Sequence, residues 1–71
     1  MRYEHEDGDN ATASAIRVGL ARKKSNQSAL AKHLQLSQPA IHRRMTGQVP
    51  WRLNELSTVA EYLGVSVSEL V

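Results

Sequence analysis

The 71-residue chain contains no cysteine and no phenylalanine, and it has no long apolar run. Without cysteine, neither a disulfide-rich domain nor a zinc finger fits the sequence. A membrane-spanning helix needs about 20 consecutive, mostly apolar residues, and a secretory signal needs an apolar core. The sequence has neither feature, so we expect a cytoplasmic protein with no membrane partner.

Aromatic residues are also scarce, since Trp51, Tyr3 and Tyr62 are the only ones. The core must therefore be built mainly from leucine, valine, isoleucine and alanine, a composition typical of helical bundles. A chain of this length forms one domain and buries only about 60% of its unfolded surface. We expect a single small all-α domain of modest stability.

The sequence shows no pattern of catalytic residues. It lacks a Ser–His–Asp arrangement, a pair of spaced carboxylates and a glycine-rich phosphate loop. His33 and His42 fall on different expected helices with no third ligand implied, so surface histidines are favoured over a metal pair. So small a core also leaves little room for a substrate pocket. We expect no enzymatic activity, no cofactor, no metal site and no small-molecule substrate.

The net charge of +2 is distributed unevenly along the chain. Residues 1–10 carry one cation and four anions, a net of −3, whereas residues 11–71 carry eight cations and three anions, a net of +5. A basic domain favours a polyanionic partner. The acidic stretch 1–9 has no apolar periodicity, so we predict a disordered tail there and a folded domain over 10–71.

Residues 26–47 are the most informative stretch, because they predict two short helices joined by a tight turn. Asn26 and Ser37 are suitable N-caps for the first and second helix. Pro39 is tolerated in the first turn of the second helix, where amides have no intrahelical partner. Gly47 follows that helix and provides a residue suited to a positive φ.

Three further helices complete the expected five-helix domain. The first begins near Asn10 or Thr12 and ends near Lys24, and another spans 53–63 and ends at Gly64. Residues 66–69 match the capping-box pattern, which predicts that a last short helix begins there. Its neighbours Val65, Val67 and Leu70 are expected to close the core.

The second helix of the 26–47 stretch has one apolar face and one polar face. With Ile41 directed inward, a step of about 100° per residue places Met45 beside it. The opposite face is polar, partly cationic and free of carboxylates. It comprises Pro39, His42, Arg43 and Thr46, with Gln38 at its edge. Such a face suits the major groove of DNA, where glutamine can read adenine and arginine guanine. A merely solvated helix face is the alternative.

The ordered set of residues over 26–47 resembles the helix-turn-helix of the lambda-repressor and Cro family (the XRE type). The matching positions are Gln27, Leu30, Ala31, Leu34, Leu36, Gln38, Ile41 and Gly47. The run from Leu63 to Leu70 is similar to the family's junction between its fourth and fifth helices, so the resemblance covers roughly residues 14–71.

Two positions depart from the family pattern. Gln35 replaces a common turn glycine and implies a positive φ. Arg44 replaces an apolar residue, so we expect its stem along the core edge and its head in solvent or at a phosphate.

The resemblance implies sequence-specific binding of double-stranded DNA, most simply by a phage-type transcriptional repressor that occupies operator DNA. It assigns base reading to Gln38, Pro39, His42 and Arg43. It assigns phosphate contacts to Gln27, Ser37, Thr46 and Arg52, and we expect Arg44 to add a further phosphate contact. Relatives often pair as homodimers or carry a further C-terminal domain.

The alternative is a protein-interaction module, such as an antitoxin, that contacts its partner through the loop at Trp51 or through the last helix. We expect Trp51 to be a loop anchor packed on the core rather than an exposed partner contact.

Overall fold

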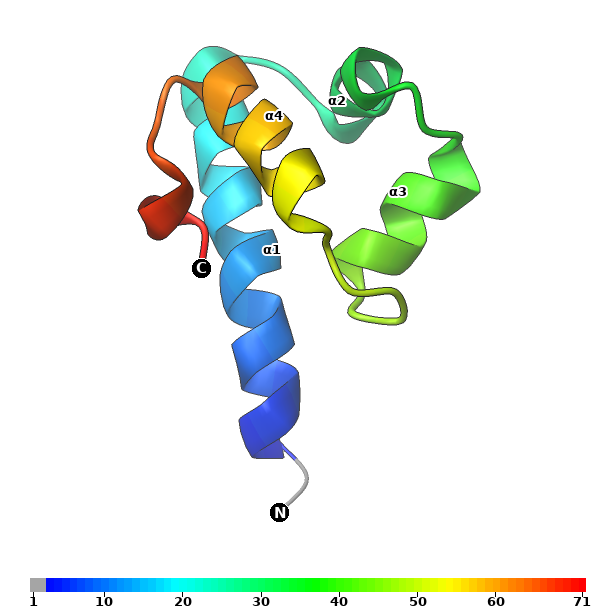
Figure 1. Cartoon of the computed structure of the whole chain (residues 1–71), viewed down its shortest axis with the longest axis vertical. Helices are drawn as coiled ribbons and strands as arrows, with labels where there is room; N and C mark the ends of the chain where they lie inside the picture. The colour runs from blue at the N-terminus through cyan, green and yellow to red at the C-terminus, as the bar shows by residue number, and fades with distance from the viewer. Residues whose placement is uncertain (1–2) are drawn as a thin grey trace.

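The computed structural model describes the backbone of residues 3–71 and the side chains of residues 11–71. This part of the chain contains four α-helices and one 3₁₀ turn, and it has no strand. The elements are α1 (Tyr3–Lys23), α2 (Gln27–Leu34), α3 (Gln38–Met45), α4 (Leu53–Leu63) and the 3₁₀ turn η1 (Val67–Glu69). The expected all-α class is confirmed. In Figure 1, α2 and α3 lie on one side of the long α1, and η1 lies on the other side.

The first helix is longer than the sequence predicted, because α1 begins at Tyr3 rather than near Asn10 or Thr12. A disordered tail was predicted over residues 1–9; the structure includes residues 3–9 in α1, and residues 1–2 lie outside the described part. No proline precedes Pro39, so no residue here lacks the amide that a helix needs. The N-terminal turns of α1 extend beyond the other helices in Figure 1. Apolar periodicity reports burial and therefore gives no signal for such a protruding end.

Each helix contributes to one apolar core. α4 packs against α1, α2 and η1, while α3 packs against α1 and α2. The side chains that are at most 7% exposed are Ala13, Ile16, Leu20, Leu30, Ala31, Ile41, Met45, Leu56, Val59, Ala60 and Leu70. Leu53 starts α4 but is 72% exposed, so its apolar character does not contribute to this core.

The contact between α1 and α4 depends on a glycine. A Cβ atom added at Gly19 would lie 2.7 Å from Leu63 Cδ1, closer than carbon atoms normally approach. The missing side chain therefore lets α4 lie directly against α1 at this point.

The expected fifth helix is a single 3₁₀ turn, so the predicted count of five α-helices is wrong. The amides of Glu69 and Leu70 donate to the carbonyls of Ser66 and Val67, three residues back, at 3.1 and 2.8 Å. The expected capping contact is present, because the Ser66 amide donates to Glu69 Oε2 at 3.2 Å. This tight turn directs Leu70 into the core, where it is 2% exposed.

Candidate nucleic-acid interface

The structure forms the predicted helix-turn-helix from α2, a short turn and α3. Asn26 Oδ1 accepts from the Ala29 amide at 2.8 Å, and Ser37 Oγ accepts from the Ala40 amide at 3.2 Å. Both predicted N-caps are confirmed. They define where each helix begins and therefore which residues each helix presents to solvent.

The turn between α2 and α3 has the backbone conformation that its sequence implied. Gln35 has a φ of 60°, in the left-handed region that favours glycine. The next amide, that of Leu36, donates to the Ala31 carbonyl at 2.8 Å and closes the end of α2. Gln35, which stands where the resembling family commonly has glycine, therefore adopts the backbone conformation that the turn needs.

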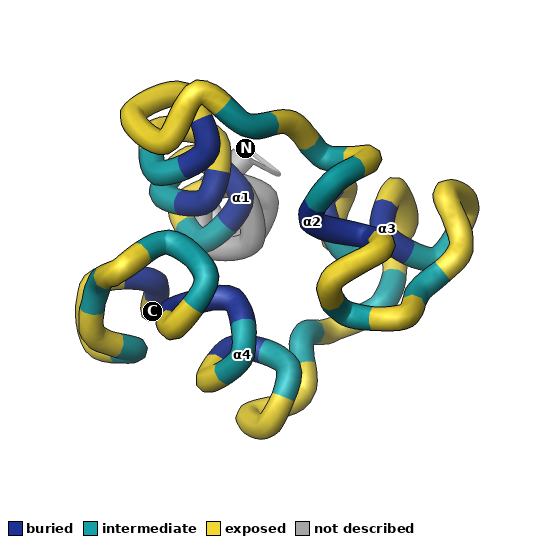
Figure 2. The backbone as a smooth tube through the Cα atoms, turned by 90° about the horizontal axis from the view of Figure 1, so that it is seen from above, coloured by how far each residue is buried: buried dark blue, intermediate teal, exposed yellow. Residues whose placement is uncertain are grey.

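The two faces of α3 are oriented as predicted. Ile41 and Met45 are 1% and 2% exposed and lie in the core. The opposite face is exposed, as the burial colours along α3 in Figure 2 show. It carries four of the predicted residues, Gln38, Pro39, His42 and Arg43, and the fifth, Thr46, is the exposed C-cap residue that follows α3.

This outer face of α3 has no negative charge. The only described carboxylate side chains are those of Glu55, Glu61 and Glu69, and none belongs to α2 or α3. The cationic Arg43 therefore stands on an exposed helix face with no acid on the same helix. A face of this composition can accept a polyanion without the cost of bringing like charges together.

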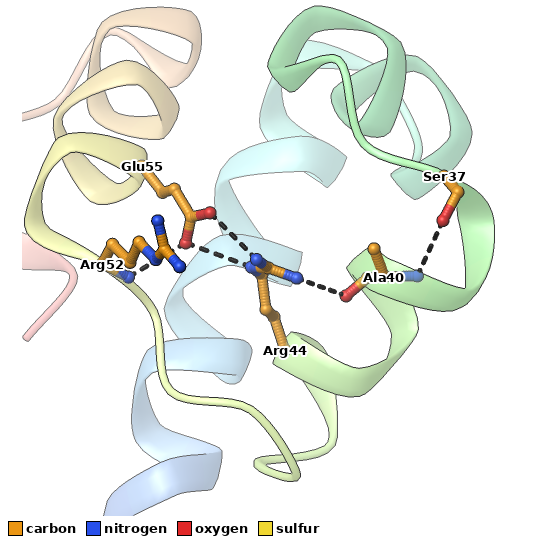
Figure 3. A network of polar contacts seen from close by, with 5 residues as sticks. All are labelled: Ser37, Ala40, Arg44, Arg52 and Glu55. Carbon is orange, nitrogen blue, oxygen red and sulfur yellow. Dashed lines mark hydrogen bonds and ion pairs between the residues drawn. The ribbon is translucent and has the colours of Figure 1, made fainter.

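Arg44 does not occupy the position predicted for its head. Its Nε and Nη2 donate to Glu55 Oε1 and Oε2 at 3.1 and 3.0 Å, and its Nη1 donates to the Ala40 carbonyl at 3.0 Å (Figure 3). The Arg44 and Glu55 side chains are only 12% and 14% exposed. The expected reach to solvent or phosphate is wrong, because a carboxylate on α4 holds the guanidinium in a bidentate ion pair.

Glu55 is a structural residue of this interface that the sequence reasoning missed. It also accepts from the Arg52 amide at 2.9 Å, so one carboxylate joins α3 to the first turn of α4. Burial raises the pKa of Glu55, but the hydrogen bonds from Arg44 and Arg52 and their charges outweigh burial and leave the pKa lowered. Glu55 is the only carboxylate between Asp9 and Glu61, which is the sequence signal that could have identified it as the partner of Arg44.

The remaining predicted phosphate residues lie around α3 but differ in exposure. Ser37 and Arg52 are the exposed N-cap residues of α3 and α4, and Arg52 is tied to the Arg44 pair through Glu55. Thr46 follows α3 and donates through Oγ1 to the Arg43 carbonyl at 3.2 Å. Gln27, the first residue of α2, is half-buried. Their binding to phosphate stays a prediction.

Trp51 packs against the core as a loop anchor, which confirms that prediction. Together with Thr12, Val49 and Leu56, it lines a cavity of about 230 Å³ under the loop after α3. Its Nε1 is buried and has no hydrogen-bond partner among the described residues.

The two histidines that we considered as a metal pair have different surroundings. The His33 ring lies 4.8 Å from the Tyr62 ring, between centroids, whereas His42 is on the exposed face of α3. Among the described side chains, no group of three metal-ligating residues comes together. None of the described helices is long and apolar enough to cross a membrane.

Two capped helices, a left-handed turn between them and an exposed second helix define a helix-turn-helix domain. Residues 9–71 match the model of the BetR domain, and this match covers most of the chain. The protein therefore belongs to the BetR domain family. That membership agrees with a helix-turn-helix protein without pointing specifically to the lambda-repressor and Cro family. No curated protein and no solved structure matches the chain.

Proposed function

We propose that this BetR domain binds double-stranded DNA sequence-specifically, with α3 in the major groove. The observation that carries the proposal is the exposed, carboxylate-free face of α3, which displays glutamine, histidine and arginine side chains. The fold supports it, because Ile41 and Met45 anchor the opposite face of the same helix in the core. A helix held in this way can enter a groove without losing its position.

In this proposal the exposed residues divide into two groups. The group that faces the bases consists of Gln38, Pro39, His42 and Arg43. Within it, Gln38 and Arg43 provide most of the base reading. Phosphate contacts come from Gln27, Ser37, Thr46 and Arg52 and determine the register of the protein on the duplex. We no longer count Arg44 among the phosphate-contacting residues, because its guanidinium forms an ion pair with Glu55. Its role is to hold α3 against α4.

The biological role that follows is a cytoplasmic transcriptional repressor that blocks promoters by occupying operator DNA. This role needs only a stable, specific complex with DNA.

The proposal is tested by selection from a random pool of double-stranded DNA, followed by titration of the selected site and a scrambled control at several salt concentrations. We expect a motif that binds at least about a thousandfold tighter than the control. Weak, salt-sensitive binding without a motif would contradict sequence recognition and leave protein partners as the alternative.

Two arginine variants separate the proposed roles. Arg43→Ala should cost about 1–3 kcal/mol on the selected site and relax its specificity, because a base contact is lost. Arg52→Ala should weaken binding to all sequences alike and reduce the salt slope by about one. Arg17→Ala removes an exposed cation from α1 and serves as the charge-matched control. Equal losses on specific and random DNA for Arg43→Ala would remove Arg43 from the base-reading group.

A further inference from the structure

The cavity under the loop after α3 lies between three parts of the fold. Its walls are formed by α1, by the end of α3 with the loop that follows, and by α4. The lining residues are Thr12, Arg44, Gly47, Val49, Pro50, Trp51 and Leu56. None of them is among the proposed base readers, so a molecule in the cavity would leave that face of α3 exposed. The volume of about 230 Å³ exceeds the roughly 150 Å³ of an engineered protein cavity that binds benzene.

The polar groups in the walls of this cavity provide hydrogen-bond donors that lack acceptors. Trp51 Nε1 is buried without a partner among the described residues, and an indole N–H can only donate. Each Nη nitrogen of Arg44 carries two N–H groups and uses one, Nη2 for Glu55 and Nη1 for Ala40. One N–H on each therefore has no described partner. Because a buried donor without an acceptor costs free energy, the site favours a molecule that brings an acceptor.

The charges around the cavity favour an acceptor that is negative. None of the lining residues is a carboxylate, whereas Arg44 lies in the wall and Arg52 directly follows Trp51. The charges of Arg44 and Arg52 both lower the pKa of Glu55, so both cations lie near that one carboxylate. Among the described side chains, two positive charges thus accompany one negative charge here. One further negative charge would balance them.

We propose that this cavity binds a small monocarboxylate with a compact apolar body. The apolar part lies between Val49, Trp51 and Leu56, and the carboxylate accepts from Arg44 and from Trp51 Nε1. Because Nε1 is buried, binding includes a shift of Trp51 toward the carboxylate. Residues 48–52 lie between α3 and α4, so this shift disrupts no helix. The inference does not depend on DNA binding.

The first test uses Trp51 as the reporter, because it is the only tryptophan and gives one indole N–H signal in NMR spectra. The wild-type chain is titrated with benzoate, with the neutral benzamide and with the cationic benzylammonium, which are similar in size. We expect benzoate to shift the indole signal downfield and to saturate with a Kd below about 1 mM. Benzamide should bind at least about tenfold more weakly, because its hydrogen bonds lack the charge. Benzylammonium should not bind.

A cavity-filling variant then tests the location. Val49→Phe places a larger side chain in the cavity and should weaken benzoate binding at least about tenfold. Val18→Phe is the matched control, because it makes the same replacement at a 49% exposed valine in a separate groove between α1 and the C-terminal segment. That control should bind benzoate as the wild type does. Circular dichroism checks that both variants fold.

The donor is tested separately by Trp51→Phe, which keeps an aromatic ring and removes the indole N–H. Calorimetry should show benzoate binding weakened at least about fivefold, because one hydrogen bond to the carboxylate is lost. This variant also decides the location if Val49→Phe does not fold.

Each outcome decides the proposal. An indole signal that benzoate does not shift at about 10 mM overturns it and leaves Nε1 to a buried water. Equal binding of the three probes rejects the carboxylate. Benzoate binding that neither Val49→Phe nor Trp51→Phe weakens places the site elsewhere and rejects the cavity. Since no measurement contains DNA, these results are independent of whether α3 reads bases.

Discussion

Replacing Glu55 with glutamine removes one negative charge from the contact between α3 and α4 and keeps the size of the side chain. Arg44 would lose its counter-charge while remaining only 12% exposed. An exposed ion pair contributes about 0–1 kcal/mol, and removing one partner of a buried pair costs about 3–5 kcal/mol. Both side chains keep slight solvent contact, and glutamine keeps one acceptor oxygen. We therefore expect the free energy of unfolding to fall by about 2 kcal/mol.

Urea denaturation at pH 7, followed by circular dichroism, measures this change directly. In a domain of this size about 1 kcal/mol corresponds to roughly 4–8 °C in Tm, so thermal unfolding should shift downward by about 8–16 °C. Glu61→Gln is the matched control, because Glu61 is an exposed glutamate on the same helix. That change should stay within about 0.5 kcal/mol of the wild type.

A double variant tests whether the loss comes from the pair. Replacing both partners, as Arg44→Met with Glu55→Leu, should restore much of the stability that either single change removes, because no uncompensated charge remains. The reasoning is refuted if Glu55→Gln costs no more than Glu61→Gln. It is also refuted if the effects of Arg44→Met and Glu55→Leu simply add.

Three further outcomes follow from the same structure. Because the folded-state pKa of Glu55 is lowered, its stabilisation is complete above the ordinary pKa of 4.5 and is lost as pH falls through the lower folded-state value. The stability difference between wild type and Glu55→Gln should therefore shrink in acid titrations below that pH, and a constant difference would contradict the ion pair. Gly19→Ala adds a Cβ that would meet Leu63 Cδ1, the end of a flexible side chain, at 2.7 Å, but it also gains about 0.5–1 kcal/mol of helix propensity, so we expect a net destabilisation of at most about 1 kcal/mol in urea; a raised midpoint would mean that Leu63 moves aside without cost. Gln35→Gly should stabilise by about 0.5 kcal/mol, because glycine removes the left-handed strain at φ 60° but loses more chain entropy. A lower urea midpoint for Gln35→Gly would show that the glutamine side chain stabilises the turn.

Predictions that rested on neighbouring residues were confirmed. The caps Asn26 and Ser37 act on amides three residues away, and the burial of Ile41 and Met45 follows from helical spacing. The left-handed Gln35 was expected because this residue replaces a turn glycine that is common in the lambda-repressor and Cro family. Such features depend on a few consecutive residues, so the sequence contains the information that determines them.

Features that depend on how the helices pack were decided only by the tertiary structure. The Arg44–Glu55 pair spans eleven positions and two helices, so no local pattern could direct the Arg44 head away from solvent. The extent of α1 to Tyr3 lacked an apolar signal. The replacement of a fifth helix by η1 depends on the position of Leu70 in the core. The groove beside Val18 exists only where α1 and the C-terminal segment meet. By itself the sequence therefore determined α2, α3 and the exposed face of α3, whereas packing determined what holds α3 in place and where the groove beside Val18 lies.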